Sequence, residues 1–104
     1  MIPARPADVS MTLDLLEEDK RPYFLWDEDL SVRQLRQKLA SKDPSQWRYY
    51  AAKIMREARY EDVWRFLSLG RVSGSWDSLR PVLGRKRELW EFLFSVWKRH
   101  GLVP

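Results

Sequence analysis

The chain has 104 residues, no cysteine and a formal net charge of +4. That length suits a single domain with one core, and the lack of cysteine excludes disulfides, thiolate catalysis and cysteine zinc sites. Hydrophobic residues make up 44% of the chain and six residues are tryptophan, so we expect an aromatic core rather than disorder. An apolar signal segment and a stretch long enough to span a membrane are both missing, so we expect a cytoplasmic protein.

The charge is unevenly distributed along the chain. Residues 1–30 carry 8 acidic and 3 basic side chains, whereas residues 31–104 carry 7 acidic and 16 basic ones. A basic body favours a nucleic acid or an acidic protein as partner. The alternative is that the acidic leader folds back over the basic body and neutralises it.

The first 22 residues are predicted to form a flexible acidic arm. They contain three of the six prolines and only one short apolar pair, Leu13 and Leu16, enough for at most two helical turns. The carboxylates of Glu17, Glu18 and Asp19 are expected to be solvated. The folded domain would then cover residues 23–104.

A first helix is predicted from Ser31 onward. Ser31 followed by Gln34 has the form of a capping box, in which each side chain satisfies a free amide at the start of a helix. Apolar residues then recur at helical spacing, at Val32, Leu35 and Leu39.

A second helix is predicted to start at Pro44. Asp43 provides an acidic N-cap, Pro44 occupies the first helical position, where its missing N–H does no harm, and Gln46 occupies the third. One side of this helix is expected to be apolar and the opposite side charged. The apolar side holds Trp47, Ala51, Ile54, Met55 and Ala58, and the charged side holds Arg48, Lys53, Arg56 and Arg59.

The rest of the chain predicts two further helices and a connector. A short helix is expected at residues 60–67, stopped by Gly70, and a connector at residues 69–84 with room for one short helix at residues 76–79. A final helix is expected at about residues 85–99. Its apolar side chains span an arc of about 200°, so it needs cover on two sides.

This pattern predicts an all-α fold, a compact bundle of four or five helices. The segment from Leu35 to Leu67 resembles one HEAT-type helix pair, because Asp-Pro opens an alanine-containing second helix. It departs from that pattern at the bulky Trp47, Tyr49 and Tyr50. One candidate unit does not predict a solenoid.

Residues suited to catalysis or metal binding are sparse. The triplet Asp27, Glu28 and Asp29 offers oxygen ligands, but acidic residues before a helix are favoured by the helix dipole, which makes a structural role the better interpretation. The single histidine, His100, lies between cations and Gly101, as at a helix C-terminus. The glycines form no phosphate-binding motif. We therefore assign no catalytic, cofactor or metal residue and expect a protein that is not an enzyme.

The aromatic residues favour a protein partner. Tryptophan and tyrosine are enriched at interfaces, and this chain has more of them than a small bundle needs for its core. The expected partner surface combines the segment before the first helix with the stripe of the last helix. Its residues are Tyr23, Trp26, Asp27, Trp90, Phe94 and Trp97.

Two alternatives stay open. A basic face could bind nucleic acid through phosphate contacts, although no recognition motif accompanies it. A homodimer with a structural task is the other alternative. The residues of the basic face are Arg48, Arg56, Arg59, Arg85, Lys86 and Arg87.

Two stretches carry a resemblance to a known family. The run RPYFLWD at residues 21–27, with residues 54–58 and the run RYEDVWRFL at residues 59–67, is similar to small uncharacterised bacterial proteins encoded beside nucleotidyltransferase-like toxins of the AbiEii type. The similarity covers residues 21–69 and does not include the basic tail. It implies a non-enzymatic partner of the toxin, either an antitoxin or an accessory subunit, that docks through its aromatic and charged surface.

Overall fold

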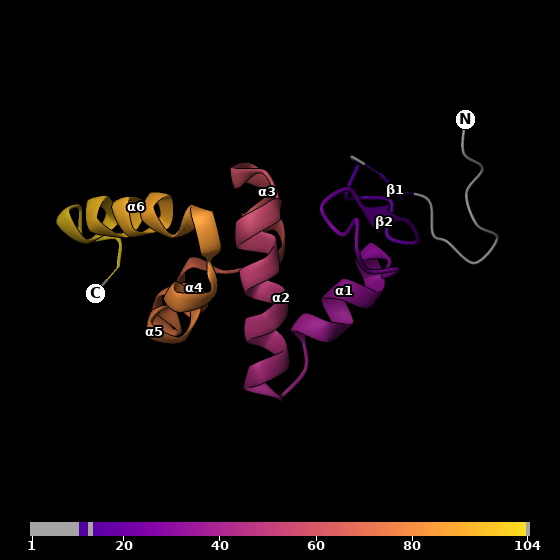
Figure 1. Cartoon of the computed structure of the whole chain (residues 1–104), viewed down its shortest axis with the longest axis horizontal. Coiled ribbons are helices and arrows are strands. Elements are labelled where there is room, and N and C mark those ends of the chain that lie inside the picture. The colour runs from indigo at the N-terminus through magenta and orange to yellow at the C-terminus, as the bar shows by residue number, and fades with distance from the viewer. Residues whose placement is uncertain (1–10, 13, 104) are drawn as a thin grey trace.

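The structure, a computed structural model, describes residues 11–12 and 14–103, and the all-α fold is confirmed (Figure 1). Within these residues there are six α-helices, where four or five were predicted. They are α1 (Val32–Leu39), α2 (Pro44–Glu57), α3 (Tyr60–Phe66), α4 (Leu69–Gly74), α5 (Trp76–Leu79) and α6 (Arg87–Arg99). Two short 3₁₀ helices, η1 (Arg80–Val82) and η2 (Gly84–Lys86), lead from α5 into α6.

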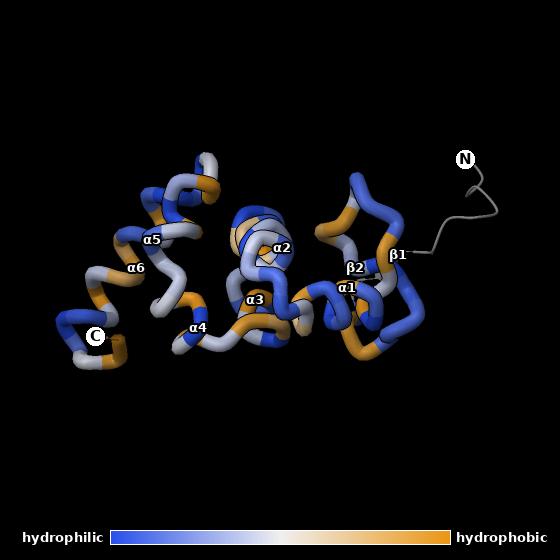
Figure 2. The backbone as a smooth tube through the Cα atoms, turned by 90° about the horizontal axis from the view of Figure 1, so that it is seen from below, coloured by the Kyte–Doolittle hydropathy of each residue, from blue (hydrophilic) through white to orange (hydrophobic). Residues whose placement is uncertain are grey.

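Helix α2 lies at the centre of the molecule. Figures 1 and 2 place α1 on one side of it and α4, α5 and α6 on the other, with α3 folded back beside its C-terminal end. Its buried side chains include Ala51, Ile54 and Met55, as the apolar pattern predicted. The small Ala51 lets neighbouring elements approach closely.

Both predicted helix starts in the first half are confirmed. The hydroxyl of Ser31 accepts from the Gln34 amide, and the Gln34 side chain accepts from the Ser31 amide, which completes the capping box. At α2 the Asp43 carboxylate accepts from the Ser45 amide, and Pro44 occupies the first turn.

The described part of the acidic leader is part of the fold, in contrast to the predicted loose arm. Leu15 is buried, and the backbone carbonyls of Lys20 and Glu18 accept from the amides of Val32 and Arg33, both at 2.9 Å. A helix start leaves such amides without partners inside the helix, so the leader completes the N-terminus of α1. Residues 1–10 and 13 of the predicted arm lie outside the described residues.

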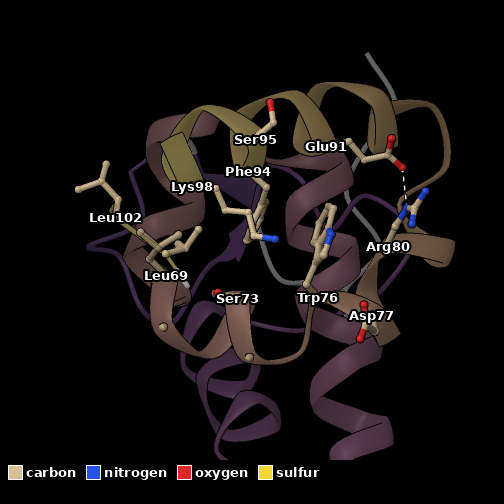
Figure 3. A pocket seen from close by; sticks show the side chains of 13 residues that line it. Leu69, Ser73, Trp76, Asp77, Arg80, Glu91, Phe94, Ser95, Lys98 and Leu102 are labelled. Atoms are coloured by element: carbon tan, nitrogen blue, oxygen red, sulfur yellow. Dashed lines mark hydrogen bonds and ion pairs between the residues drawn. The ribbon is translucent and has the colours of Figure 1, made fainter. Parts of the chain in front are cut away.

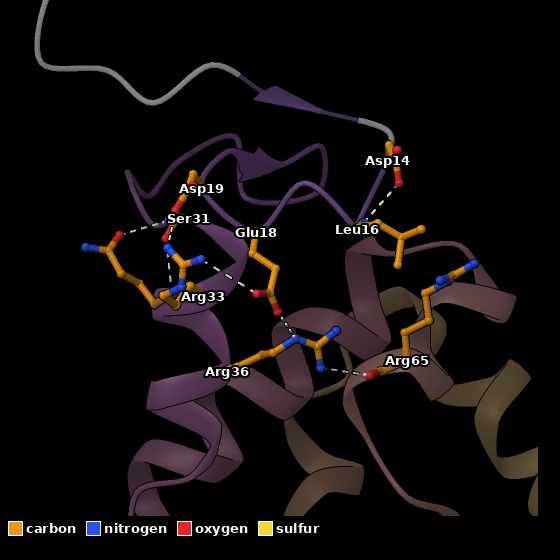
Figure 4. Close-up of polar contacts among 9 residues, drawn as sticks. Asp14, Leu16, Glu18, Asp19, Ser31, Arg33, Arg36 and Arg65 are labelled. Atoms are coloured by element: carbon orange, nitrogen blue, oxygen red, sulfur yellow. Dashed lines mark hydrogen bonds and ion pairs between the residues drawn. The ribbon is translucent and has the colours of Figure 1, made fainter.

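Side chains of the leader also contact α1 (Figure 4). The Glu18 carboxylate lies 3.7 Å from both Arg33 and Arg36, and Arg33 also pairs with Asp19. A two-residue parallel pairing of β1 (Met11–Thr12) with β2 (Arg21–Pro22) precedes α1. Glu18 and Asp19 are exposed to solvent, as expected, and both are also ion-paired with arginines of α1.

The region predicted as a connector contains one helix more than expected. Gly70 does not stop α3, which ends at Phe66; instead it lies inside α4, whose start is capped by the Ser68 hydroxyl accepting from the Arg71 amide. The predicted short helix at residues 76–79 is confirmed as α5. The two glycines Gly70 and Gly74 made α4 look like a loop in the sequence.

The C-terminus of α6 has the geometry that the sequence indicated. Gly101 has φ of 72°, a conformation that favours glycine. The Leu102 amide donates to the Trp97 carbonyl and the Gly101 amide to the Lys98 carbonyl, which together form a Schellman motif. None of the helices in the described part of the chain is both long enough and apolar enough to cross a membrane.

Candidate docking site

A cleft opens between α4 and α5 on one side and α6 on the other (Figure 3). Its volume is about 930 Å³, within the range of about 300–1,000 Å³ that is usual for ligand pockets. We call it the α4–α6 cleft. Its lining includes Leu69, Gly70, Ser73 and Gly74 from α4, Trp76, Asp77 and Arg80, then Glu91, Phe94, Ser95 and Lys98 from α6, and finally Leu102 and Val103.

Aromatic rings form the floor of the α4–α6 cleft. Trp76 stacks on Phe94 with ring centroids 4.2 Å apart and an angle of 20° between the planes. Phe94 in turn meets the ring of Trp97 edge to face at 5.1 Å, and Trp97 contacts Trp64 and Trp90. A connected set of rings of this kind holds the floor in one arrangement, because each ring is fixed by its neighbours.

The α4 wall is made of small residues. Gly70, Ser73 and Gly74 fall three and four positions apart and so share one face of the helix. A Cβ atom added at Gly70 or at Gly74 would meet no heavy atom within 4 Å. The space in front of α4 is therefore open. The cleft is wide at this wall because two of its residues have no side chain.

The rim of the cleft is charged. Arg80 donates to the Glu91 carboxylate at 2.8 Å, and Arg87 lies 3.2 Å from the same oxygen. Lys98 is exposed and extends from α6 toward Trp76 in Figure 3. Among the described residues it has no ion pair, so its ammonium group is available to a ligand.

Two of the residues predicted for the partner surface on the last helix lie in the core. Trp90 is 2% exposed and Phe94 is 7% exposed, so the prediction of an open aromatic stripe was wrong for both. Trp97 is partly buried against the same core. The exposed apolar side chains of α6 are instead Leu89 and Phe92. Phe94 still belongs to the site, because its ring supports Trp76 in the floor.

The other predicted partner residues lie at the opposite end of the molecule. Trp26 is 65% exposed and is free to meet a partner. Tyr23 is partly buried: its hydroxyl donates to the Asp62 carboxylate at 2.5 Å and accepts from the Arg59 amide at 2.8 Å. Burial and the bond to Asp62 raise the pKa of Tyr23 to about 12. Tyr23 therefore holds the segment to α3 rather than offering its hydroxyl to a partner.

Asp27 and its neighbour Glu28 hold a buried lysine. The ammonium group of Lys53 lies 2.6 Å from an Asp27 oxygen and 2.7 Å from a Glu28 oxygen, and the lysine is only 4% exposed. Tyr50 and Tyr49 donate to Glu28 at 2.9 and 3.2 Å. We call these five residues the Lys53 cluster. The assignment of Lys53 to a charged surface was wrong, because the segment before α1 covers it.

Charge interactions in the Lys53 cluster change the pKa values of its members. The hydrogen bond from Lys53 lowers the pKa of Asp27. Burial alone would raise the pKa of Glu28, but its bonds from Lys53 and the two tyrosines outweigh burial and lower it. Burial, followed by the bond to Glu28, raises the pKa of Tyr50 to about 12. The cluster is thus a set of complementary charges that stabilise one another.

The six basic residues of the alternative nucleic-acid surface do not all present free charges. Arg56 donates to the Val82 carbonyl at 2.8 Å, Arg59 lies over the Tyr23 ring at 5.2 Å, and Arg87 pairs with Glu91. Arg48 and Arg85 are exposed, Lys86 is partly so, and none of these three has an ion pair among the described residues. Half of the predicted face is therefore occupied by contacts within the chain.

Groups that could perform chemistry do not converge. His100 is exposed at the C-terminal cap of α6. Within the described residues, no three or more histidine or carboxylate side chains come close enough together to hold a metal ion. Asp27 and Glu28 are directed at Lys53 instead.

Comparison of this chain with protein-family models, with curated proteins and with solved structures found no match.

Proposed function

We propose that this protein is a non-enzymatic interaction module that binds another protein in the α4–α6 cleft. The cleft itself carries the proposal: it combines a stacked Trp76 and Phe94 floor with Lys98 at its rim, a cation that has no ion pair among the residues that the structure describes. Anchored aromatic pockets bounded by polar groups are the usual centres of protein interfaces.

Two exposed apolar side chains support an interaction role. Phe92 on α6 is 60% exposed and Leu102, at the edge of the cleft, is 63% exposed. A partner larger than the cleft would cover such side chains as well. Leu102 is continuous with the cleft because it belongs to its lining.

The resemblance of residues 21–69 leads us to propose, further, that the partner is a nucleotidyltransferase-like toxin of the AbiEii type. The protein would then act as an antitoxin or an accessory subunit. Trp26 is exposed at the far end of the molecule and would provide a second contact with a toxin that also covers that end.

Capture experiments with a blocked cleft test the proposal. In Gly70→Leu the added side chain enters open space on the α4 wall, whereas Gly70→Ala adds only one carbon at the same position. Both replace glycine inside a helix and so favour the fold by about 0.5–1 kcal/mol. Tagged wild type and Gly70→Ala should capture the same protein from a lysate of the native host after nuclease treatment, and Gly70→Leu should not. Equal capture by all three would contradict the proposal.

Nucleic-acid binding is the second candidate, and Arg85 and Lys86 favour it. They lie at the N-terminal end of α6, where the helix dipole is positive, so a basic pair there is stabilised by a bound anion. Capture that disappears with nuclease, and an affinity that falls steeply with salt, would favour this function. A sedimentation mass of two chains would favour the structural homodimer.

A further inference from the structure

The outer side of α6 carries an apolar stripe that the described part of the chain leaves partly open. At about 100° per residue, its four members fall within an arc of about 100°, centred about 110° from the buried Trp90. Leu89 is 49% exposed and Phe92 is 60% exposed, and the other two members are partly exposed. We call this set the α6 stripe; it consists of Leu89, Phe92, Leu93 and Val96.

Partly exposed aromatic rings continue the α6 stripe toward α3. Leu93 lies four residues before Trp97, so the two side chains are neighbours on the helix surface. The Trp97 ring lies 5.9 Å from the Trp64 ring, which lies 5.9 Å from the ring of Tyr60, a residue that is 47% exposed. Single exposed apolar side chains are normal on a protein surface, whereas contiguous ones mark contact sites. The outer side of α6 therefore has the character of an interface.

The charges beside the α6 stripe differ in sign at its two ends. Glu88 lies in the first turn of α6 and Arg99 in the last, and both fall on the same edge of the stripe. Neither has an ion pair among the described residues. A partner face of uniform charge would meet one like charge, whichever sign it carried. The face that fits carries a base beside Glu88 and an acid beside Arg99.

A second copy of α6 has this reversed pattern when it lies antiparallel to the first. A two-fold axis through the middle of the stripe places Leu89 opposite Val96 of the other copy. Arg99 of that copy then lies about two residues, or about 3 Å, beyond the position opposite Glu88, which these long side chains can span. In a contact of this symmetry the same ion pair forms twice. A parallel arrangement would place like charges together instead.

We propose that α6 pairs antiparallel with α6 of a second copy of this chain, through the α6 stripe. The second copy supplies the cover that the apolar arc of α6 lacks within the described residues. Arg85 and His100 lie one turn beyond the two ends of the stripe, where the contact is open to water and salt screens their charge. Figure 1 places α6 at one end of the molecule, opposite the leader, so another copy has access to it.

This pairing is independent of the proposed function. Glu91, Ser95 and Lys98, through which α6 lines the α4–α6 cleft, lie on the opposite side of the helix from the α6 stripe. The cleft therefore stays open in the dimer. The second copy covers Phe92, and Leu102 remains available to a partner in the cleft.

Sedimentation equilibrium of the nuclease-treated full chain tests the pairing. We expect a mass of two chains in the wild type and of one chain in Phe92→Glu, because this change places a charge within the apolar contact of each copy. Leu16→Glu is the matched control: it makes an equivalent change at a 77% exposed position of the leader and should remain a dimer. Both residues are exposed in the single chain, so both variants should fold, which circular dichroism checks.

Exchange of charges tests the antiparallel arrangement. Glu88→Arg alone, or Arg99→Glu alone, puts like charges together at both ends of the contact, and each should weaken the dimer by about tenfold. The double variant of Glu88→Arg with Arg99→Glu exchanges the two charges and restores both ion pairs. Its dissociation constant should return to within about threefold of the wild-type value.

Several results would overturn the inference. They are a wild-type chain that is still a monomer at about 1 mM, a dimer that survives Phe92→Glu, and a double variant as weak as the single ones. A dimer that is lost in Gly70→Leu would place the second copy in the α4–α6 cleft and would also overturn it. The proposed function is tested separately: Phe92→Glu should still capture the partner protein, whereas Gly70→Leu should remain a dimer and fail to capture it.

Discussion

Lys53 is the residue whose environment differs most from its expected one. Helical periodicity places it on the charged side of α2, and in the structure it is 4% exposed. A buried ammonium group is tolerated only when it is paired, and Asp27 and Glu28 provide two carboxylates within 2.7 Å. The position of Lys53 is therefore set by a segment that precedes it by 25 residues.

Replacing Lys53 should destabilise the protein. Lys53→Met keeps the length of the side chain but leaves Asp27 and Glu28 facing each other without a cation. We expect a loss of about 2 kcal/mol in the free energy of unfolding, measured in urea. Lys42→Met removes an exposed lysine before α2 and should change the free energy by less than about 0.5 kcal/mol. Similar losses in the two variants would show that the Lys53 cluster contributes nothing.

The pH dependence of stability should reveal the same cluster. The folded state lowers the pKa of Asp27 and of Glu28, so it binds their protons less readily than the unfolded state does. Their contribution is therefore present above the ordinary carboxyl pKa values and is lost as the pH falls below about 4. Thermal melts between about pH 6 and pH 3 should decline less steeply in Lys53→Met than in the wild type. Parallel curves would contradict this assignment.

Tyr23 joins the N-terminal segment to α3 through a single hydroxyl group. Tyr23→Phe removes the donor to Asp62, which is itself buried, and the acceptor for the Arg59 amide. We expect a loss of about 1–3 kcal/mol, seen as a lower melting temperature. Tyr49→Phe is the matched control: its hydroxyl is on an exposed ring, and Glu28 keeps two other donors. A melting temperature in Tyr23→Phe equal to that of the control would contradict this role.

At the level of elements, helix ends were predictable where side chains cap them. Ser31 and Gln34 signalled the start of α1 correctly, because a capping box is a local pattern. The amides of Val32 and Arg33 donate instead to the backbone carbonyls of Lys20 and Glu18. Such carbonyls have no sequence signature, since every residue has one. This is why the leader was predicted to be a loose arm.

The cap of α1 gives a prediction about this element. In Ser31→Ala the Gln34 amide loses its acceptor, and we expect a loss of about 1 kcal/mol. Ser45→Ala, in the exposed first turn of α2, removes a hydroxyl that is not a cap and should be nearly neutral. Urea unfolding of the two variants compares them directly. A neutral Ser31→Ala would show that the leader carbonyls alone suffice to start α1.

The candidate site was only partly predictable from the sequence. The wide apolar arc of α6 predicted that the helix is covered on two sides, and this was wrong: Trp90 and Phe94 are buried, but Leu89 and Phe92 of the same arc are 49% and 60% exposed. Periodicity does not say which residues are covered, however, and the buried Trp90 was assigned to the surface. Gly70, Ser73 and Gly74 were assigned to a connector. Their spacing of three and four positions, which places them on one face of a helix, could have indicated the wall of the cleft.

Over the whole molecule, the C-terminal end of α2 is where distant parts of the chain meet. The Trp90 indole donates to the Met55 carbonyl at 3.0 Å, and the Tyr23 hydroxyl accepts from the Arg59 amide. Both backbone groups lie where a helix end leaves groups without intrahelical partners. α6 therefore completes the C-terminal end of α2, and the N-terminal segment completes the start of α3 directly after it.

Trp90→Phe tests this connection. The variant retains a ring in the core but leaves the Met55 carbonyl without its donor, so we expect a loss of about 2 kcal/mol or more. Trp26→Phe changes the same residue type at a 65% exposed position and should stay within about 0.5 kcal/mol of the wild type. Chemical unfolding monitored by circular dichroism avoids the change in tryptophan fluorescence. Equal stability of the two variants would contradict the role of the indole bond.

The meeting point at the end of α2 has a consequence for biosynthesis. Tyr23 precedes Arg59 by 36 residues, and Trp90 follows Met55 by 35. While the chain is being translated, the bond from Tyr23 can form once α2 has left the ribosome, but the Met55 carbonyl stays open until residue 90 emerges. Residue 90 must therefore leave the ribosome before the Met55 carbonyl has its donor. A nascent chain that has exposed residue 59 but not residue 90 has the Tyr23 bond to the Arg59 amide without the Trp90 bond to the Met55 carbonyl.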